Sequence, residues 1–325
     1  MKLLVTGGAG YIGSIVARQL LSDGHDVTVL DNLKQGHREA VPDGAQLQVA
    51  DLLDRDALGA VIGRGFDGVL HFAALALVGE SVAHPERYYR TNVGGTLNLL
   101  EAMLEANVGA LVFSSTCAVY GEPETVPIPE SALPRPTNPY GASKLAVDHM
   151  IGGFCRAHQL GAVSLRYFNV AGAAGGLGED HRPETHLIPN ILRAATGQNP
   201  HVEIFGTDYP TPDGTAIRDY IHIEDLVSAH VLALAGSIAG QHRIFNLGNG
   251  SGFSVREVIA AAQKVTGADI PTREAPRRPG DPPMLVAASD RIRSELGWVP
   301  QKPQLERMVS DAWEFARARP DGYSD

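Results

Sequence analysis

Hydrophobic positions in the first half of the chain alternate between short uninterrupted runs and longer stretches with a helical period. The short runs are typical of buried strands, and the periodic stretches between them are typical of amphipathic helices. Strands that alternate with helices predict right-handed crossovers and a parallel sheet covered on both faces. The predicted strands are Lys2–Thr6, Asp26–Leu30, Gln46–Val49, Gly68–Phe72, Ala110–Ser114 and Ala162–Tyr167, and the clearest predicted helices are Ser14–Ser22, Tyr88–Ala106 and Gly141–Gln159.

The pattern changes after Phe168, where glycine, proline and short mixed segments dominate. We therefore predict an α/β protein with a Rossmann-type, doubly wound parallel sheet in residues 1–168. A second, smaller mixed α/β lobe for the substrate is expected in residues 169–325. The apolar run Arg243–Leu247 predicts a strand that could return to the main sheet, so the first domain is expected to include part of residues 217–248.

Composition narrows the class of protein. The 325 residues are 44% hydrophobic and 20% charged, which is typical of a globular chain with a large core, and the net charge of -10 argues against a nucleic-acid partner. The first ten residues lack the pattern of a signal peptide, and no run approaches the roughly 20 apolar residues of a membrane span. Two cysteines fit a reducing compartment, so we expect a cytoplasmic chain without a membrane segment. No spacing of His and Cys indicates a metal site.

A dinucleotide site is predicted at the first turn of the chain. The segment Gly7–Gly13 has glycine at its first, fourth and seventh positions and lies between the first strand and the first helix. Such glycines let a pyrophosphate approach the amides of a helix N-terminus. Asp31 ends the second strand, where a carboxylate accepts from an adenosine ribose and favours NAD over NADP. Asp51 could reach the adenine or could equally cap a helix over Leu52–Val61.

A catalytic group is predicted where Tyr140 and Lys144 lie four residues apart. Pro139 cannot lie inside a helix, so a helix is expected to begin at about Tyr140, with both side chains on one face. An ammonium beside a phenol favours the phenolate and should lower the pKa of the tyrosine from about 10 towards neutrality. The hydroxyl residues Ser114–Thr116 end the fifth predicted strand and face the same crevice, so Thr116 could relay or orient a proton.

These motifs resemble those of the extended short-chain dehydrogenase/reductases. Over its whole length the chain is similar, more narrowly, to the UDP-glucose 4-epimerase family. The stretches that carry this resemblance include VTGGAGYIGS, LDNL, FSSTCAVYG, NPYGASK, HLIP and IFGTDYPTPDGTAIRDYIHIEDL. The resemblance implies a homodimer, in which the helix over Tyr88–Ala106 and the helix from Tyr140 would pack with their copies as a four-helix bundle.

The resemblance also implies a reaction and a set of site residues. Tyr140 would take the proton of the sugar 4-hydroxyl while C4 passes hydride to NAD+, and the 4-keto sugar would then turn and accept the hydride on its other face. Thr116 and Lys144 would complete the catalytic group. The implied NAD contacts are Gly7, Gly10, Tyr11, Ile12, Gly13, Asp31, Asn32, Asp51, Leu52, Phe72, Ala73, Tyr140 and Lys144. The implied UDP-sugar contacts are Thr116, Asn169, Leu187, Phe205, Arg218, Tyr220, Arg278, Asp281 and Leu285.

Two positions depart from the pattern of that family. Ala76 stands where many members carry Lys near the cofactor. This difference removes one cation from that side, so NAD could be held less tightly than in those members. Leu285 stands where glucose-selective members carry a bulky Tyr and members that tolerate N-acetyl sugars carry a small residue. We therefore hypothesise limited activity on UDP-N-acetylglucosamine.

Other functions remain open at this stage. Sugar-nucleotide 4,6-dehydratases commonly carry acidic residues directly after the threonine, where this chain has Cys117 and Ala118. A 4-epimerase of UDP-xylose and UDP-arabinose, or of UDP-N-acetylhexosamines, would use the same catalytic residues. An NAD-sensing regulator on the same fold could dispense with the Tyr140–Lys144 pair, and the presence of both residues argues against it.

Overall fold

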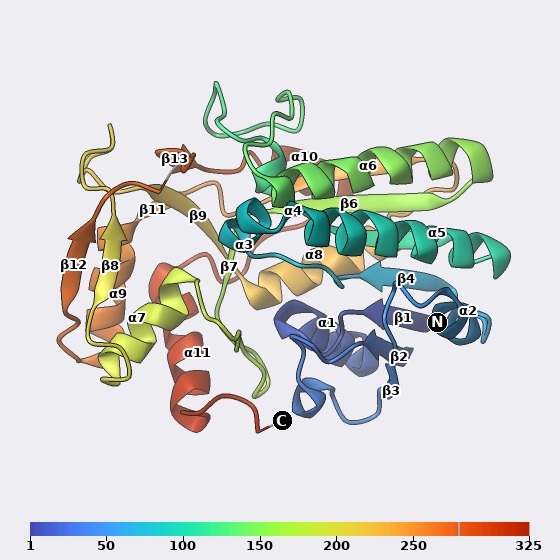
Figure 1. Cartoon of the computed structure of the whole chain (residues 1–325), viewed down its shortest axis with the longest axis horizontal. Coiled ribbons are helices and arrows are strands. Elements are labelled where there is room, and N and C mark those ends of the chain that lie inside the picture. Colours follow the sequence, from blue (N-terminus) through green and yellow to red (C-terminus); the bar gives the residue numbers. More distant parts are fainter. Residues whose placement is uncertain (279, 325) are drawn as a thin grey trace.

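A parallel sheet of seven strands forms the larger part of the computed structural model, which describes residues 1–278 and 280–324 (Figure 1). The strand order is β10-β6-β5-β4-β1-β2-β3. This reversal of order on either side of β1 and β4 is that of a doubly wound sheet, and it confirms the predicted fold class. The strands are β1 (Lys2–Thr6), β2 (Asp26–Asp31), β3 (Gln46–Val49), β4 (Gly68–His71), β5 (Ala110–Thr116), β6 (Gly161–Tyr167) and β10 (His242–Leu247).

Helices cover both faces of this sheet. Successive side chains of a strand point to opposite faces, so Leu3 and Val5 pack into one core with α1 and α8, whereas Leu4 packs into another with α2, α5 and α6. Figure 1 shows α5 and α6 side by side next to β6, and α1 and α8 pack against each other on the sheet. The helices are α1 (Tyr11–Ser22), α2 (Arg55–Ile62), α3 (Val78–Ala83), α4 (Pro85–Tyr88), α5 (Gly95–Glu105), α6 (Pro139–His158), α8 (Ile223–Ala235) and α10 (Asp290–Leu296).

The helix predicted over Tyr88–Ala106 is interrupted. Its first part is α4, its last part is α5, and a π-helical turn occupies Tyr89–Gly94 between them. Helix α6 begins at Pro139, one residue earlier than predicted, because the Asn138 side chain accepts a 2.9 Å hydrogen bond from the Gly141 amide. Proline at the first helical position loses no hydrogen bond. The rigid start of α6 carries Tyr140 in its first turn.

A second group of elements forms a smaller lobe with its own apolar core. Three helices, α7 (Leu187–Ala195), α9 (Val255–Thr266) and α11 (Leu305–Ala318), pack together there. One small sheet joins β7 (Asn169–Ala171), β9 (Ile217–His222), β11 (Gly252–Ser254) and β13 (Met284–Leu285), and a second joins β8 (Val202–Phe205) and β12 (Thr272–Ala275).

The chain crosses between the two sheets more than once. Strand β10 pairs with β6 along its whole length, from His242 opposite Ala162 to Leu247 opposite Tyr167. This pairing confirms the predicted return of Arg243–Leu247 to the main sheet. Strand β9 belongs to the small sheet, and α8, which directly follows β9, covers the large one. The border between the two lobes is therefore formed by segments from both halves of the chain.

Candidate active site

The turn between β1 and α1 has the close backbone approaches that a dinucleotide site requires. Gly7 has φ +70°, and a Cβ built there would lie 2.5 Å from the amide nitrogen of Ala73. A Cβ on Gly13 would lie 2.3 Å from the carbonyl oxygen of Gly7. Gly10 is the N-cap of α1 without a side chain to occupy the helix end. The residues present thus fit a pyrophosphate against the N-terminus of α1.

Asp31 lies at the end of β2 and is held by the glycine turn. Its carboxylate accepts hydrogen bonds from the amides of Ala9 at 3.0 Å and Leu33 at 2.9 Å. Burial raises the pKa of this carboxyl, and the two amide donors oppose the shift. A carboxylate oxygen has lone pairs beyond those used here, so Asp31 can still accept from a ribose hydroxyl.

Asp51 does not cap α2. Its Oδ2 accepts from the Asn32 side chain at 2.9 Å and from Lys34 at 3.0 Å, and its Oδ1 accepts from the Leu53 amide. The alternative interpretation of Asp51 as a helix cap is therefore wrong: Asp54 caps α2 by accepting from the Ala57 amide at 3.0 Å. Two turn carboxylates three residues apart could not be told apart from the sequence pattern.

The other predicted NAD contacts surround the same turn. The amides of Phe72 and Ala73 both donate to the Thr6 carbonyl, which places them beside the end of β1. Leu52 is buried beside Gly95 at the start of α5. The Tyr11 hydroxyl donates a 2.6 Å hydrogen bond to the Gly172 carbonyl, and Ile12 packs against the core that contains Leu3 and Val5. Tyr11 thus ties the cofactor turn to the start of the smaller lobe.

Tyr140 at the start of α6 and Thr116 at the end of β5 are neighbours. The Thr116 hydroxyl is close enough to the Tyr140 phenol to lower its pKa, and it accepts from the Ala118 amide at 3.2 Å. The Tyr140 ring stands edge-on to Tyr88, with 6.5 Å between ring centroids. The hydroxyl at the end of β5 and the phenol at the start of α6 are therefore adjacent, as general acid–base chemistry on one substrate hydroxyl requires.

Lys144 lies one turn beyond Tyr140 and is almost fully buried. Its ammonium donates a 2.8 Å hydrogen bond to the Ser114 carbonyl and lies 4.8 Å from the centroid of the Phe113 ring. Burial lowers the pKa of Lys144 to about 7, and the Asp148 carboxylate opposes that shift. At neutral pH the side chain is therefore near its own titration midpoint.

The predicted effect of Lys144 on the phenol is wrong for this structure. Burial raises the pKa of Tyr140 to about 12, and the hydrogen bond from Thr116 only partly opposes this increase. The lysine has little effect because its ammonium is directed to Ser114 and is itself costly to ionise in the buried site. Four-residue spacing places both groups on one face, but it does not decide the direction of the pKa shift.

Several buried polar residues that support this group had no signal in the sequence. The Asn92 side chain, in the π-helical turn, accepts a hydrogen bond from the Leu75 amide. It donates to the Leu75 carbonyl and to the Ser143 hydroxyl. Asp148 continues the face of α6 that carries Lys144 and forms a buried ion pair with Arg166 at 2.8 Å. A regular helix would have carried Asn92 past these partners, so only the irregular turn explains its position.

Arg218 is the central cation of the substrate side. Its guanidinium forms an ion pair with Asp281 and donates to the carbonyl oxygens of Ile217 and Pro282. Burial raises the pKa of the Cys117 thiol to about 12, and the positive charge of Arg218 opposes this increase. Arg218 in β9 is therefore close to the end of β5 that carries Thr116.

The remaining predicted substrate residues line the same border. Arg278 stacks on Phe205, with its guanidinium carbon 3.9 Å from the ring centroid. Asn169 pairs with Tyr220 between β7 and β9, and Leu285 pairs with Arg218 between β13 and β9. Leu285 and Cys117 pack against one small apolar cluster. Leu187 is the first residue of α7, and Ala76 is exposed.

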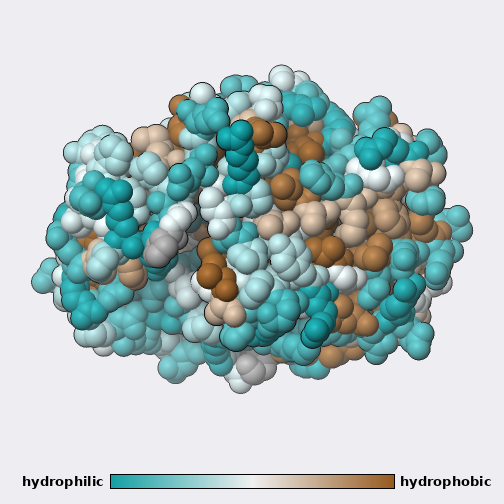
Figure 2. All heavy atoms as spheres, turned by 45° about the horizontal axis from the view of Figure 1, so that its top comes forward, coloured by the Kyte–Doolittle hydropathy of each residue, from teal (hydrophilic) through white to brown (hydrophobic). Residues whose placement is uncertain are grey.

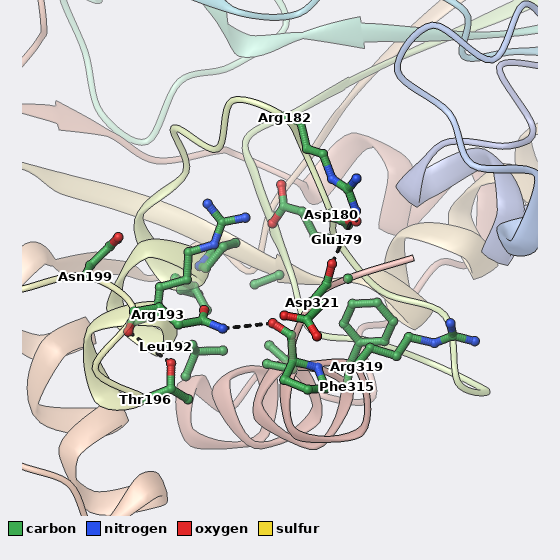
Figure 3. A pocket seen from close by; sticks show the side chains of 18 of the residues that line it. Glu179, Asp180, Arg182, Leu192, Arg193, Thr196, Asn199, Phe315, Arg319 and Asp321 are labelled. Atoms are coloured by element: carbon green, nitrogen blue, oxygen red, sulfur yellow. Dashed lines mark hydrogen bonds and ion pairs between the residues drawn. The ribbon is translucent and has the colours of Figure 1, made fainter. Parts of the chain in front are cut away.

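A cavity of about 590 Å³ lies away from these residues (Figure 3). It is bordered by α7, α11 and the segments 179–182 and 319–322, and its lining includes none of the predicted catalytic residues. Its size therefore does not identify it as the reaction site. In the described part of the chain, no helix has both the length and the apolar character needed to cross a bilayer.

The chain belongs to the NAD dependent epimerase/dehydratase family, whose model matches residues 3–248. It is 57% identical to UDP-glucose 4-epimerase from Streptomyces lividans, over 100% of this chain and 98% of that protein. A crystal structure of UDP-glucose 4-epimerase superposes with a TM-score of 0.96 at 46% identity, over 100% of both chains. The UDP-glucose 4-epimerase of Bifidobacterium longum in complex with NAD+ and UDP superposes with a TM-score of 0.94 at 37% identity, over 99% of this chain and 100% of that one.

Proposed function

We propose that this protein interconverts UDP-glucose and UDP-galactose with NAD as a bound cofactor. The observations that carry the proposal are the proximity of Thr116 to Tyr140 and the glycine turn after β1 that fits a dinucleotide. The similarity to UDP-glucose 4-epimerases over full length supports it. The cofactor, when bound, supplies a reversible hydride acceptor and a positive charge that favours the phenolate.

The residues of the chain handle the proton of this reaction. Tyr140 removes the proton from the sugar 4-hydroxyl and later returns it, while Thr116 orients the hydroxyl by hydrogen bonding. Lys144 lies one turn beyond Tyr140 on α6 and is fixed by the Ser114 carbonyl. The same pair serves both directions, because the phenolate that gains a proton in the first half of the reaction returns it in the second.

The diphosphate end of the substrate meets the other side of the crevice. Arg218 and Arg278 supply the cations that an anionic ligand needs in a protein of net charge -10. Phe205 carries Arg278 on its face and offers an apolar surface beside it. Anchoring through the nucleotide leaves the sugar free to turn, which is what hydride return to the opposite face requires.

The size of the Leu285 side chain limits the space beside the sugar. It lies next to Arg218 across β13 and β9 and packs with Cys117. Leucine is smaller than tyrosine and larger than glycine or alanine, so we propose limited acceptance of UDP-N-acetylglucosamine besides the hexose substrates. UDP-pentoses lack the bulk that this position would exclude.

A homodimer is part of the proposal. Val82, Tyr89 and Leu97 expose apolar side chains along α3, the π-helical turn and α5. Figure 2 shows hydrophobic side chains gathered across the face that these helices form with α6. Burying this surface against a second copy would remove it from water. Light scattering tests this point: a monomer at micromolar concentration would contradict it.

The function is tested by incubating the purified chain with UDP-galactose, UDP-arabinose or UDP-N-acetylgalactosamine, one at a time and without added NAD. Chromatography would detect the 4-epimer in each reaction. We expect fast conversion of UDP-galactose, slow conversion of the N-acetyl sugar, and retained NAD after denaturation. No conversion of any of the three, even with added NAD, would refute the proposed activity.

A further inference from the structure

Four side chains from the segment before α7 converge outside the proposed active site. They are Glu179, His181, Glu184 and His186, and each offers one ligand atom within 4.8 Å of all the others. The segment has no regular secondary structure and ends at His186, the N-cap of α7. Sequence spacing gave no metal motif here, because two of the four residues are glutamates and the backbone between them is irregular.

Three of the six distances between these atoms are close to those of a tetrahedral site. His181 Nδ1 lies 3.2 Å from Glu179 Oε1 and 3.8 Å from Glu184 Oε2, and His186 Nδ1 lies 2.9 Å from Glu179 Oε1. Zinc bound at about 2.0–2.2 Å by imidazole nitrogen and carboxylate oxygen requires ligand atoms about 3.3–3.6 Å apart. The measured distances bracket that range, so small side-chain movements would complete the coordination.

Two of the four atoms have no hydrogen bond from the described residues. They are His181 Nδ1 and Glu184 Oε2. The Glu184 side chain is fully buried, and its other oxygen already accepts from the amides of Thr185 and His186. Oε2 is directed at His181 without the geometry of a hydrogen bond. A buried carboxylate oxygen without a hydrogen-bond donor is costly unless a cation satisfies it.

We propose that Glu179, His181, Glu184 and His186 bind one zinc ion that fixes the segment leading into α7. Two imidazoles and two carboxylates match the ligand preferences of Zn²⁺, and their two negative charges balance the charge of the ion. Glu179 also lines the cavity of Figure 3, and His186 is 43% exposed, so an ion has a path from solvent. The Glu184 side chain is fully buried, and that of Glu179 is mostly buried.

The site lies where it can affect substrate binding without touching the reacting atoms. Leu187, which follows His186, is a predicted substrate contact at the start of α7. The charge of Glu179 also contributes, after burial, to the raised pKa values of the Tyr11 and Tyr220 phenols. The cluster is therefore close to both the cofactor turn and β9. Zinc there would hold the first turn of α7 in place.

The direct test is zinc binding by the full, tag-free chain. Chelator-treated protein would be dialysed against Zn²⁺, and bound metal measured by mass spectrometry. We expect one equivalent in the native chain and at least about tenfold weaker binding in His181→Ala/Glu184→Gln, since even partners of metal ligands cost 10–100-fold. The matched control is His201→Ala/Glu203→Gln, in the same lobe. Co²⁺ in place of zinc should give the visible spectrum of a tetrahedral site.

Two results would overturn the proposal. One is less than half an equivalent of zinc in the native chain, and the other is equal binding by the site variant and its control. Circular dichroism and NAD content would show that both variants are folded. Glu184→Gln alone, which preserves the shape of the side chain, provides a second variant that should also lose zinc.

Discussion

The Lys144 ammonium donates a 2.8 Å hydrogen bond to the carbonyl oxygen of Ser114. This contact fixes the lysine from α6 against the end of β5 and directs its charge away from the Tyr140 phenol. The lysine is thus positioned by the strand end that also carries Thr116. The catalytic group is therefore a product of strand and helix together, and not of the four-residue spacing on α6 alone.

Removing the phenol hydroxyl should abolish the chemistry and spare the cofactor. Tyr140→Phe keeps the ring against Tyr88 but removes the group that exchanges the proton. We expect turnover of UDP-galactose to fall by about 10²–10⁴-fold with the NAD content unchanged. Tyr89→Phe, which alters an exposed phenol, is the matched control. Equal turnover in the native chain and Tyr140→Phe would refute the role of Tyr140.

The buried ammonium of Lys144 should make stability depend on pH. Burial depresses the pKa of this lysine from 10.5 to about 7, so the unfolded chain binds more protons between these values. Stability should therefore rise with pH across that window and be lost as the pH falls through 7. Lys144→Met removes this dependence and should be more stable than the native chain below pH 7, by about 5 kcal/mol at most.

This comparison is measured by urea unfolding of NAD-free protein at a series of pH values. The difference between the two chains should shrink as the pH approaches 10.5. A constant difference from pH 6 to pH 10 would show that folding does not lower the pKa of the lysine.

The glycine turn should reject even a methyl group. In Gly13→Ala the new Cβ would lie 2.3 Å from the Gly7 carbonyl oxygen, so the turn must shift and NAD should be lost during purification. Gly59→Ala is the control, because α2 leaves open space there and alanine favours a helix by about 1 kcal/mol. Absorbance and NAD content after gel filtration compare the two. Full NAD content in Gly13→Ala would contradict the assigned role of the turn.

The side chain at Leu285 should tune the choice of sugar. Leu285→Tyr fills the space beside Arg218 and should abolish turnover of UDP-N-acetylglucosamine while preserving that of UDP-galactose. Leu285→Ala should change the ratio of the two rates in the opposite direction, by about 10-fold. Parallel rate measurements on both substrates provide the check. A ratio that is the same in all three chains would remove Leu285 from the substrate site.

The elements that the sequence predicted well are those that a hydrophobic pattern within one short segment defines. Strands β1 and β3 have the predicted bounds, and the return of β10 to the sheet followed from its apolar run. The π-helical turn at Tyr89–Gly94 was missed because its residues have ordinary helical periodicity. The direction of the Tyr140 pKa shift was missed because it depends on burial by residues distant in sequence.

Convergent side chains from irregular segments were also beyond sequence patterns. Asp54 and Asp51 are equivalent as turn carboxylates until the hydrogen bond to Ala57 distinguishes them. The cluster from Glu179 to His186 depends on how an irregular backbone folds back on itself, which no periodicity encodes. Site residues at strand ends, such as Thr116, were easier, because sheet topology alone brings strand ends together.

The pairing of β10 with β6 has a consequence for synthesis of the chain. A ribosome that has released only the first 168 residues has produced six strands of the large sheet, and β6 is still an open edge. All seven residues of β6 are buried in the finished protein, so this edge would expose apolar side chains and unpaired amides until Leu247 emerges. Truncation after the first domain should therefore yield an aggregating fragment, whereas the complete chain protects that edge with its own later strand.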